Sequence, residues 1–488
     1  MTESLPALVF LVPLAAAVSM PVVGHWKRSA CRPLTAAAAV AMTLLAIASL
    51  CSVVAFGPVR YAVGGWQAPL GIEWVADEVS ATMAAIASLV GLLVLGFSGP
   101  LGEASLAGRT VPYHTTVLLL LAGVVGVIYA GDLFNIFVFL EVVSLASYAL
   151  VAVPGGRALL SAFRYLMIGA LATAFYLLGV AYFYALTGTL NIADLAQRLP
   201  GLLESKAAAG GIAFILIGLA IKMALLPVHA WLPDAYAHAP NSAAPLLAAL
   251  VTKTAILVWA RILLWGIIPA NAGAEQILYA VVSGLGIVAS VGGALLAIRQ
   301  TEIKRIFAYG GIAHVGLVMV GLGQSSTKAT AGALYYLVND AVMQAGLFIF
   351  AGVAAWRYGV RAIDDIAGAQ IRNPWVIAPL VIAAVGMVGI PPTGGFVGKW
   401  NILLGTMEAG NPFAAGALVL TSLLTLGYFA PVLERIFRSQ QASRTGELRG
   451  ALGWPVRLSM AVPAGLVLGL GIFGDGLMSA FLRVVGGP

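Results

Sequence analysis

Long apolar runs alternate with short polar connections along almost the whole chain. A helix that crosses a bilayer needs about 20 apolar residues, and about fourteen runs reach this length. We therefore predict an all-α polytopic membrane protein, a single membrane domain over residues 1–488. The predicted spans are residues 5–24, 34–56, 79–97, 112–130, 134–153, 161–186, 210–228, 241–266, 275–298, 305–324, 329–355, 375–400, 411–434 and 454–474. The connection from Thr187 to Ala209 is expected to hold a short surface helix.

The composition supports this assignment and narrows the chemistry. Hydrophobic residues make up 61% of the chain and charged residues only 9%, whereas soluble domains carry about 25% charged residues. The net charge of +7 is scattered over many loops, so we expect the lipid bilayer as a partner and not nucleic acid. Cys31 and Cys51 are too few for a disulfide framework. Because no metal-ligand spacing or nucleotide-binding motif is present, we expect no cofactor and no metal.

The positively charged residues predict the topology. If the first connection, HWKRSACR, faces the cytoplasm, about 17 of the 26 Lys and Arg residues fall on the cytoplasmic side and about 5 on the outer side. This positive-inside pattern, with an even number of spans, places both termini on the outer side of the cytoplasmic (inner) cell membrane. The later cytoplasmic loops contain Arg157, Arg164, Arg299, Lys304, Arg305, Arg357, Arg361, Arg372, Arg435, Arg438, Arg444 and Arg449.

Two predicted spans are interrupted by prolines next to a lysine. The seventh, in GLAIKMALLPVHAWLPDAYAHAP, carries Lys222 before Pro227, and the twelfth, in VGMVGIPPTGGFVGKW, carries Lys399 after Pro391 and Pro392. Interrupted helices at corresponding positions of two halves indicate an inverted-repeat transporter. We therefore expect two inverted five-helix repeats. The predicted divisions are three N-terminal spans in 1–111, repeats in 112–266 and 275–434, and a C-terminal span and tail in 454–488.

Among the titratable side chains inside the predicted spans, five are candidates for proton transfer. They are Glu141, Lys222, Lys253, His314 and Lys399. A charge at the centre of a bilayer costs about 2.5 kcal/mol or more, so such residues indicate function by default. Purely structural roles stay open beside this one: a lysine near a helix end can extend towards the interface, a histidine can serve packing, and Glu141 and Lys222 can form a structural ion pair. Accessory candidates are His229, Asp234, His238 and Asp340.

These motifs resemble the proton-conducting antiporter family. It includes the D-type subunit of Mrp multisubunit cation/proton antiporters and the antiporter-like subunits of complex I and membrane-bound hydrogenases. The resemblance covers essentially the whole chain. It rests on the segments GDLFNIFVFLEVVSLASYAL, IKMALLPVHAWLPDAYAHAPNSAAPLLAALVTKTAI, KRIFAYGGIAHVGLVMVG and GIPPTGGFVGKW.

The resemblance implies a role for each buried charge. Glu141 would pair with Lys222, and protons would then pass through Lys253 and His314 to Lys399. The eleventh span departs from the family pattern, because Gln344 stands in a region where the family commonly has a lysine. Asp340, by contrast, is similar to an aspartate of Mrp-type members.

The expected function is proton translocation by one subunit of a larger membrane complex. We predict the D-type subunit of an Mrp-type Na⁺/H⁺ antiporter, with other membrane subunits as partners, H⁺ and Na⁺ as the transported ions, and no catalytic chemistry on this chain. The first alternative is a proton-pumping subunit of a redox-driven complex, such as a hydrogenase or a complex I relative. The others are a stand-alone solute transporter and a structural scaffold.

Overall fold

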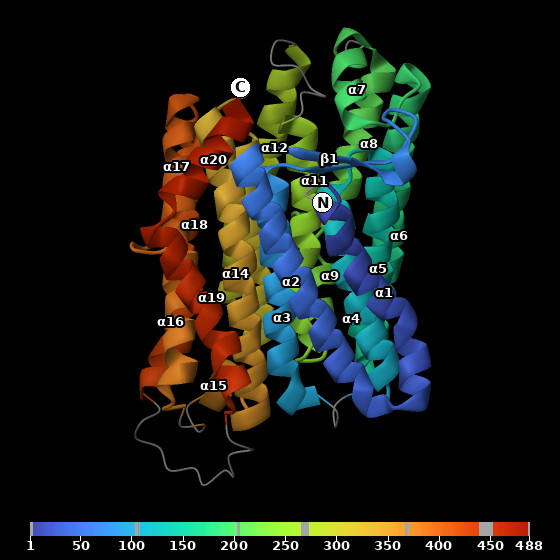
Figure 1. Cartoon of the computed structure of the whole chain (residues 1–488). Coiled ribbons are helices and arrows are strands. Elements are labelled where there is room, and N and C mark those ends of the chain that lie inside the picture. The colour runs from blue at the N-terminus through green and yellow to red at the C-terminus, as the bar shows by residue number, and fades with distance from the viewer. Residues whose placement is uncertain are drawn as a thin grey trace.

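Long helices that run side by side make up most of the computed structural model (Figure 1). It describes residues 3–102, 106, 108–202, 205–264, 273–366, 369, 371–438 and 452–486. Within these ranges, twelve helical stretches are long and apolar enough to cross a membrane. Eleven of them are single helices: α1 (Leu5–Trp26), α2 (Cys31–Phe56), α3 (Glu78–Gly102), α4 (Thr110–Tyr129), α5 (Leu133–Ala152), α6 (Arg157–Thr187), α12 (Gly273–Ile298), α13 (Ile303–Leu322), α14 (Thr327–Tyr358), α18 (Pro412–Arg438) and α19 (Trp454–Ile472).

Two further predicted spans, which are not among these twelve stretches, are broken into two helices each. In the first, α8 (Lys206–Lys222) ends before Pro227 and α9 (Trp231–His238) follows it. In the second, α16 (Pro374–Val388) and α17 (Gly394–Glu408) flank the Pro391–Pro392 pair. Proline cannot donate a backbone hydrogen bond and clashes with the preceding helical turn, so both helices stop short of it. The predicted polytopic helical membrane fold is confirmed, with twelve candidate spans besides the two broken segments at Pro227 and at Pro391–Pro392. The inverted repeats stay a prediction.

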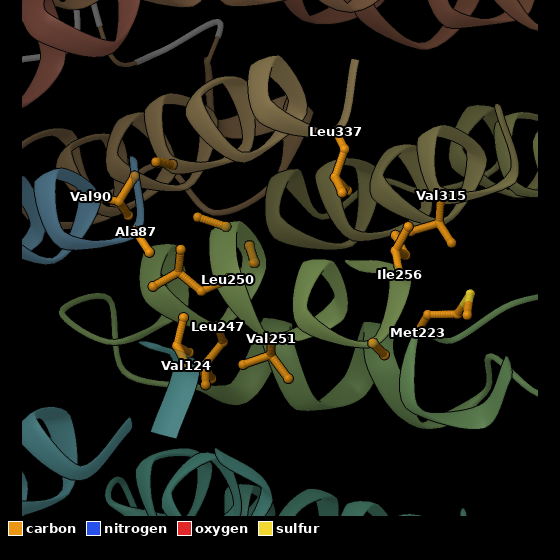
Figure 2. Packing of buried hydrophobic residues seen from close by; sticks show 14 of the residues in the cluster. Ala87, Val90, Val124, Met223, Leu247, Leu250, Val251, Ile256, Val315 and Leu337 are labelled. Carbon is orange, nitrogen blue, oxygen red and sulfur yellow. The ribbon is translucent and has the colours of Figure 1, made fainter. Parts of the chain in front are cut away.

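The remaining full-length span contains a local distortion that periodicity did not predict. Residues Ala244–Ile262 begin with α10 (Ala244–Leu246), pass through the π-helical segment η4 (Leu247–Val251), and continue as α11 (Thr252–Leu264). Figure 2 shows Leu247, Leu250 and Val251 among apolar side chains of α3, α4, α13 and α14. Single π turns inside α-helices often occur at functional sites, and Lys253 lies two residues after the end of this one.

Both described chain ends lie towards the same end of the bundle (Figure 1). That end also carries α7 (Ile192–Arg198), which is the short helix expected between Thr187 and Ala209, and a small β-ribbon. In the ribbon, which the all-α prediction did not include, β1 (Val59–Ala62) pairs antiparallel with β2 (Glu73–Ala76). Other short elements are η1 (Arg28–Ala30), η2 (Val63–Gly65), η3 (Pro200–Leu202), α15 (Ile363–Ile366) and α20 (Asp475–Gly486). Arg444, Arg449 and the predicted span end at 265–266 lie outside the described residues.

The most buried helices are the ones that carry the central titratable residues. Of the most apolar segment of α14, 94% is buried inside the protein, whereas the buried share is 39% in the peripheral helices α1 and α2. Neighbouring α12 and α13 approach closely through small residues. A Cβ added to Gly316 would lie only 2.3 Å from the backbone nitrogen of Ser290. Small residues at helix contacts are the usual way in which membrane helices pack.

A buried series of charged and polar side chains

Lys222 and Glu141 form an ion pair between α8 and α5. The Nζ of Lys222 lies 3.1 Å from Oε1 of Glu141 and 2.5 Å from Oγ of Ser144, which is one turn further along α5. Thr173 of α6 donates a hydrogen bond to the same carboxylate oxygen. Lys222 is also in the last turn of α8, where the negative end of the helix dipole favours a cation. The predicted pair is therefore a direct contact with hydrogen-bonding support from two hydroxyl groups.

The backbone just after Lys222 is strained. Ala224 has a φ of 56°, the only positive value for a non-glycine residue within the described ranges. A left-handed conformation costs an L-residue roughly 1–2 kcal/mol. The carbonyl of Ile221 accepts a hydrogen bond of 2.9 Å from the indole of Trp231 and one of 3.1 Å from the backbone N–H of Ala224, so it is satisfied although the helix ends here. Strain of this kind often accompanies functional sites because the surrounding packing must hold it in place.

Lys253 and Asp340 form a second ion pair, deeper in the bundle. The Nζ of Lys253, on α11, lies 2.8 Å from Oδ2 of Asp340, on α14, and both side chains are 2% exposed. Lys253 also donates a hydrogen bond of 3.0 Å to the carbonyl of Ala248 in the π-helical segment. The other carboxylate oxygen of Asp340 has no hydrogen-bond partner within the described residues and lies 3.9 Å from Nδ1 of His314. Asp340, expected only as an accessory residue, thus contacts one proton-transfer candidate and lies near another.

His314 lies between two buried tyrosines. Its Nδ1 is hydrogen-bonded to the hydroxyl of Tyr336 on α14, and its Nε2 lies 3.3 Å from the hydroxyl of Tyr428 on α18. The imidazole is completely buried. A neutral imidazole has one donor and one acceptor nitrogen. Here each of the two nitrogens has a tyrosine hydroxyl as its partner. The fully partnered ring fits a packing role as well as a relay.

Lys399 has neutral oxygen atoms as its hydrogen-bond partners. Its Nζ donates to the carbonyls of Met387 and Val388, at 2.6 and 3.2 Å, and to Oγ of Ser422 at 3.1 Å. The two carbonyls belong to the last turn of α16, at the break, so the ammonium group caps the negative end of that helix. Tyr336 is also close, with the Nζ 5.7 Å from its ring centroid. Lys399 is therefore buried and does not extend towards an interface.

The accessory candidates in the PVHAWLPDAYAHAP run lie elsewhere. Asp234 forms ion pairs with Arg305 at 2.9 Å and with Arg164 at 3.6 Å. His238 is hydrogen-bonded through Nδ1 to Oγ of Ser161 at 3.0 Å. These contacts connect α9 to α6 and α13 and fix the position of the broken segment.

His229 lies in the break between α8 and α9. Its Nδ1 is 3.2 Å from the carbonyl of Pro227, and its ring packs edge-on against Tyr309. The structure therefore separates the accessory histidines from the central charges, whereas it brings Asp340 into contact with them.

Several polar residues of the site were not predicted from the sequence. Thr173, Tyr336 and Tyr428 come from three different helices and contact the predicted charges across the bundle. A signal for one of them was present in TSLLTLGY on α18, where Ser422, Thr425 and Tyr428 recur at intervals of three residues. Within the described residues there is no group of three or more His, Cys, Asp or Glu side chains that could hold a metal ion.

A polytopic helical bundle with two broken helices and a series of buried charges defines the class of membrane ion transporters. Residues 130–425, more than half of the chain, match the family described as NADH:quinone oxidoreductase/Mrp antiporter, TM. The chain belongs to this family.

Similarity to individual relatives and to a solved structure supports the same family assignment. The chain is 37% identical to NADH-quinone oxidoreductase subunit N of Desulforudis audaxviator, over 98% of this chain and 97% of that protein. It is 35% identical to the D subunit of the Na(+)/H(+) antiporter of Alkalihalophilus pseudofirmus, over 81% of this chain and 79% of that protein. A chain of the Mrp complex from Dietzia sp. superposes with a TM-score of 0.88 and 27% identity, over 99% of this chain and 97% of that one. The predicted resemblance is confirmed.

Proposed function

We propose that the protein is a proton-translocating subunit of a multisubunit membrane complex. The observation that carries the proposal is the arrangement of its buried charges. Lys222 pairs with Glu141, Lys253 pairs with Asp340, and Asp340 in turn lies close to His314. Each of these charges is energetically costly in a membrane interior, so its presence there indicates a function. Ion pairs joined by a titratable imidazole provide neighbouring sites that can hold and pass on a proton.

The first step depends on how strongly Glu141 holds the charge of Lys222. At the observed 3.1 Å their attraction is about 5 kcal/mol for an effective dielectric constant of about 20. Moving the groups apart to about 7 Å would reduce this by roughly 3 kcal/mol. That change corresponds to about a hundredfold in the affinity of Lys222 for its proton. A movement of a few ångströms in α5 or in the broken helix would therefore make Lys222 release its proton towards Lys253.

Asp340 provides a second switch of the same kind. Its carboxylate stabilises the ammonium of Lys253 through Oδ2, while the free Oδ1 faces His314. A proton that reaches this carboxylate would weaken its hold on Lys253 and lie next to the imidazole. Asp340 can therefore connect Lys253 to His314 although Gln344 occupies the position of the family lysine.

The exposure of Glu141 supports a partner subunit on this face. Its side chain is 32% exposed and follows the same outward stripe of α5 as Phe134, Val138 and Leu145. A carboxylate that faces lipid is strongly unfavourable. A neighbouring membrane subunit that covers α5 would remove Glu141 from lipid and could shift its distance to Lys222. This is the reason to prefer an assembled complex over a stand-alone transporter.

Two types of complex are candidates. The first is an Mrp-type assembly that exchanges a monovalent cation such as Na⁺ for protons. The name of the antiporter relative indicates Na⁺/H⁺ exchange for that protein, and the superposed chain belongs to an Mrp complex. The second is a redox-driven complex, favoured by the NADH-quinone oxidoreductase relative, whose similarity extends over nearly the whole chain. Mass spectrometry of the complex purified from its own membranes would separate them. Small membrane subunits support the exchanger, and iron–sulfur subunits support the redox-driven complex.

We also propose the cytoplasmic membrane as the location, with both termini on the outer side. The bundle end that carries β1, α7 and α20 would then face outwards. The distribution of Lys and Arg supports this orientation.

Transport by variants of the assembled complex tests the proposed function. Glu141→Ala and Lys222→Ala are each expected to reduce proton transport in membrane vesicles by at least about tenfold per complex. Lys328→Ala is a matched control, because Lys328 pairs with Glu408 at an exposed position. If both Glu141→Ala and Lys222→Ala transport like the control, the charges only pack and the protein is a structural scaffold.

A further inference from the structure

Helix α18 contacts both His314 and Lys399, which have no direct hydrogen bond to each other among the described residues. Tyr428 is hydrogen-bonded to Nε2 of His314 at 3.3 Å, and Ser422 accepts a hydrogen bond from Lys399 at 3.1 Å. Both residues belong to the same helix, and Thr425 stands midway between them. Residues three apart are neighbours on a helix surface, so Thr425 stands next to both Ser422 and Tyr428 on α18.

The spacing of these residues suits a short hydrogen-bonded chain. Six helical positions separate Ser422 from Tyr428, which corresponds to about 9 Å along the axis, with Thr425 about halfway. Thr425 and Tyr428 are buried, and Ser422 is half-buried. A row of three hydroxyl groups on α18 therefore lies between the contact point of His314 and the contact point of Lys399.

The two nitrogens of His314 face different parts of the bundle. Nδ1 faces α14, with Tyr336 bonded to it and Asp340 at 3.9 Å, whereas Nε2 faces α18. An imidazole that gains a proton on one nitrogen can lose a proton from the other. The ring is thus oriented to take a proton from the Lys253–Asp340 side and give one to Tyr428.

We propose that Tyr428, Thr425 and Ser422 form a hydroxyl pathway that carries protons between His314 and Lys399. The inference rests on the proposed function and adds three proton-transfer residues to it. The Nε2–H bond of His314 breaks and the proton binds the Tyr428 oxygen, while the phenol proton moves to Thr425. Thr425 and Ser422 repeat this exchange. The last proton binds Nζ of Lys399 once that ammonium group has released a proton, and Ser422 then donates to Nζ, from which it accepts a hydrogen bond in the observed structure. Each hydroxyl group gains one proton and loses one, so none ends with a charge.

Thr425 also has an ordinary structural contact. Its Oγ1 donates a hydrogen bond of 2.7 Å to the carbonyl of Thr421, as buried threonines in helices commonly do. The oxygen keeps free lone pairs that can accept from Tyr428, and rotation of the hydroxyl about the Cβ–Oγ1 bond can direct its proton towards Ser422. The competing route is Tyr336, which contacts His314 and has its ring near Lys399.

Proton transport by the assembled complex in vesicles tests the pathway. Tyr428→Phe keeps the ring and removes the hydroxyl, and we expect transport per complex to fall by at least about tenfold. The matched control is Tyr335→Phe, because the Tyr335 hydroxyl is bonded to the carbonyl of Leu470 and lies outside the pathway. The control should stay within about twofold of the native complex. The rate ratio between H₂O and D₂O should rise in Tyr428→Phe, whereas a packing defect leaves it unchanged.

The possible outcomes separate this inference from the proposed function. If Lys222→Ala abolishes transport but Tyr428→Phe transports like the control, the pathway is wrong while the function stands. Loss of transport in Tyr336→Phe but not in Tyr428→Phe would assign the step to Tyr336. Should Tyr428→Phe fail to assemble, Ser422→Ala decides, because unchanged transport in that variant also overturns the pathway. If Lys222→Ala transports normally, the proposed function itself fails.

Discussion

Removing one member of the Lys253–Asp340 pair should strongly destabilise the protein, and removing both should restore much of the stability. The two side chains are 2% exposed and 2.8 Å apart. At this distance their attraction is about 6 kcal/mol for an effective dielectric constant of about 20. This attraction offsets the cost of taking two charges out of water, so each charge depends on the other.

The size of the effect follows from the burial. Asp340→Leu leaves the ammonium of Lys253 with only the carbonyl of Ala248 as a partner, and Lys253→Met leaves a buried carboxylate. Breaking a buried pair in this way costs about 3–5 kcal/mol, whereas replacing both members by apolar residues is often nearly neutral. We therefore expect each single variant to lose about 3–5 kcal/mol and the double variant to lose less than either.

The free energy of unfolding in detergent micelles titrated with SDS measures these effects. Arg438→Ala provides the control, because its pair with Glu434 is largely exposed and should contribute less than about 1 kcal/mol. The reasoning is refuted if either single variant is as stable as Arg438→Ala. It is equally refuted if the losses of the two single variants simply add in the double variant, because independent sites behave in that way.

Three further predictions concern single positions. Gln344→Lys should leave transport within about threefold of the native complex, since Asp340 already connects Lys253 to His314; a gain of about tenfold or more would show that the missing lysine limits transport. Ala224→Val should lower the free energy of unfolding by about 1–2 kcal/mol because a β-branched residue resists positive φ, and Ala224→Gly should change it by less; equal effects would contradict the strain. Burial raises the pKa of Asp132, the N-cap of α5, from 3.8 to about 6, so its ionisation lowers stability as the pH rises from about 4 to 6. Asp132→Asn keeps a capping oxygen and should be more stable than the native protein above pH 6 but not below pH 4, and parallel pH profiles would count against this.

Local patterns were enough to predict the main features of the fold. Apolar runs of sufficient length mark the spans because the bilayer sets the length of a helix. Prolines mark the breaks in the seventh and twelfth spans because each removes a backbone donor. The β-ribbon after α2 was missed, since a strand of four residues in a polar connection has almost no periodic signal. The π-helical segment was missed because LAALV is as apolar as an ordinary buried helix.

The contacts of the candidate site depend on tertiary packing, and the sequence could identify only some of its members. A lone charge in an apolar run is conspicuous, so Lys253 and Lys399 were found. Tyrosine and threonine are common in membrane helices, so Tyr336 and Thr173 gave no signal until the helices were assembled. The resemblance supplied a partner for Lys222, whereas the partner of Lys253 is 87 positions away in the sequence and became visible only as a contact of 2.8 Å.

That contact changes the significance of the missing lysine in the eleventh span. A lysine at position 344 would lie one turn from Asp340 and would compete with Lys253 for the same carboxylate. With glutamine there, Asp340 has one cationic partner, and its second oxygen remains available on the side of His314. A single carboxylate between a lysine and an imidazole can respond to either, because a proton on His314 and a proton on Lys253 both draw on its charge. Under the proposed function, we therefore expect Asp340, and not a cation at position 344, to hold the central role in this span.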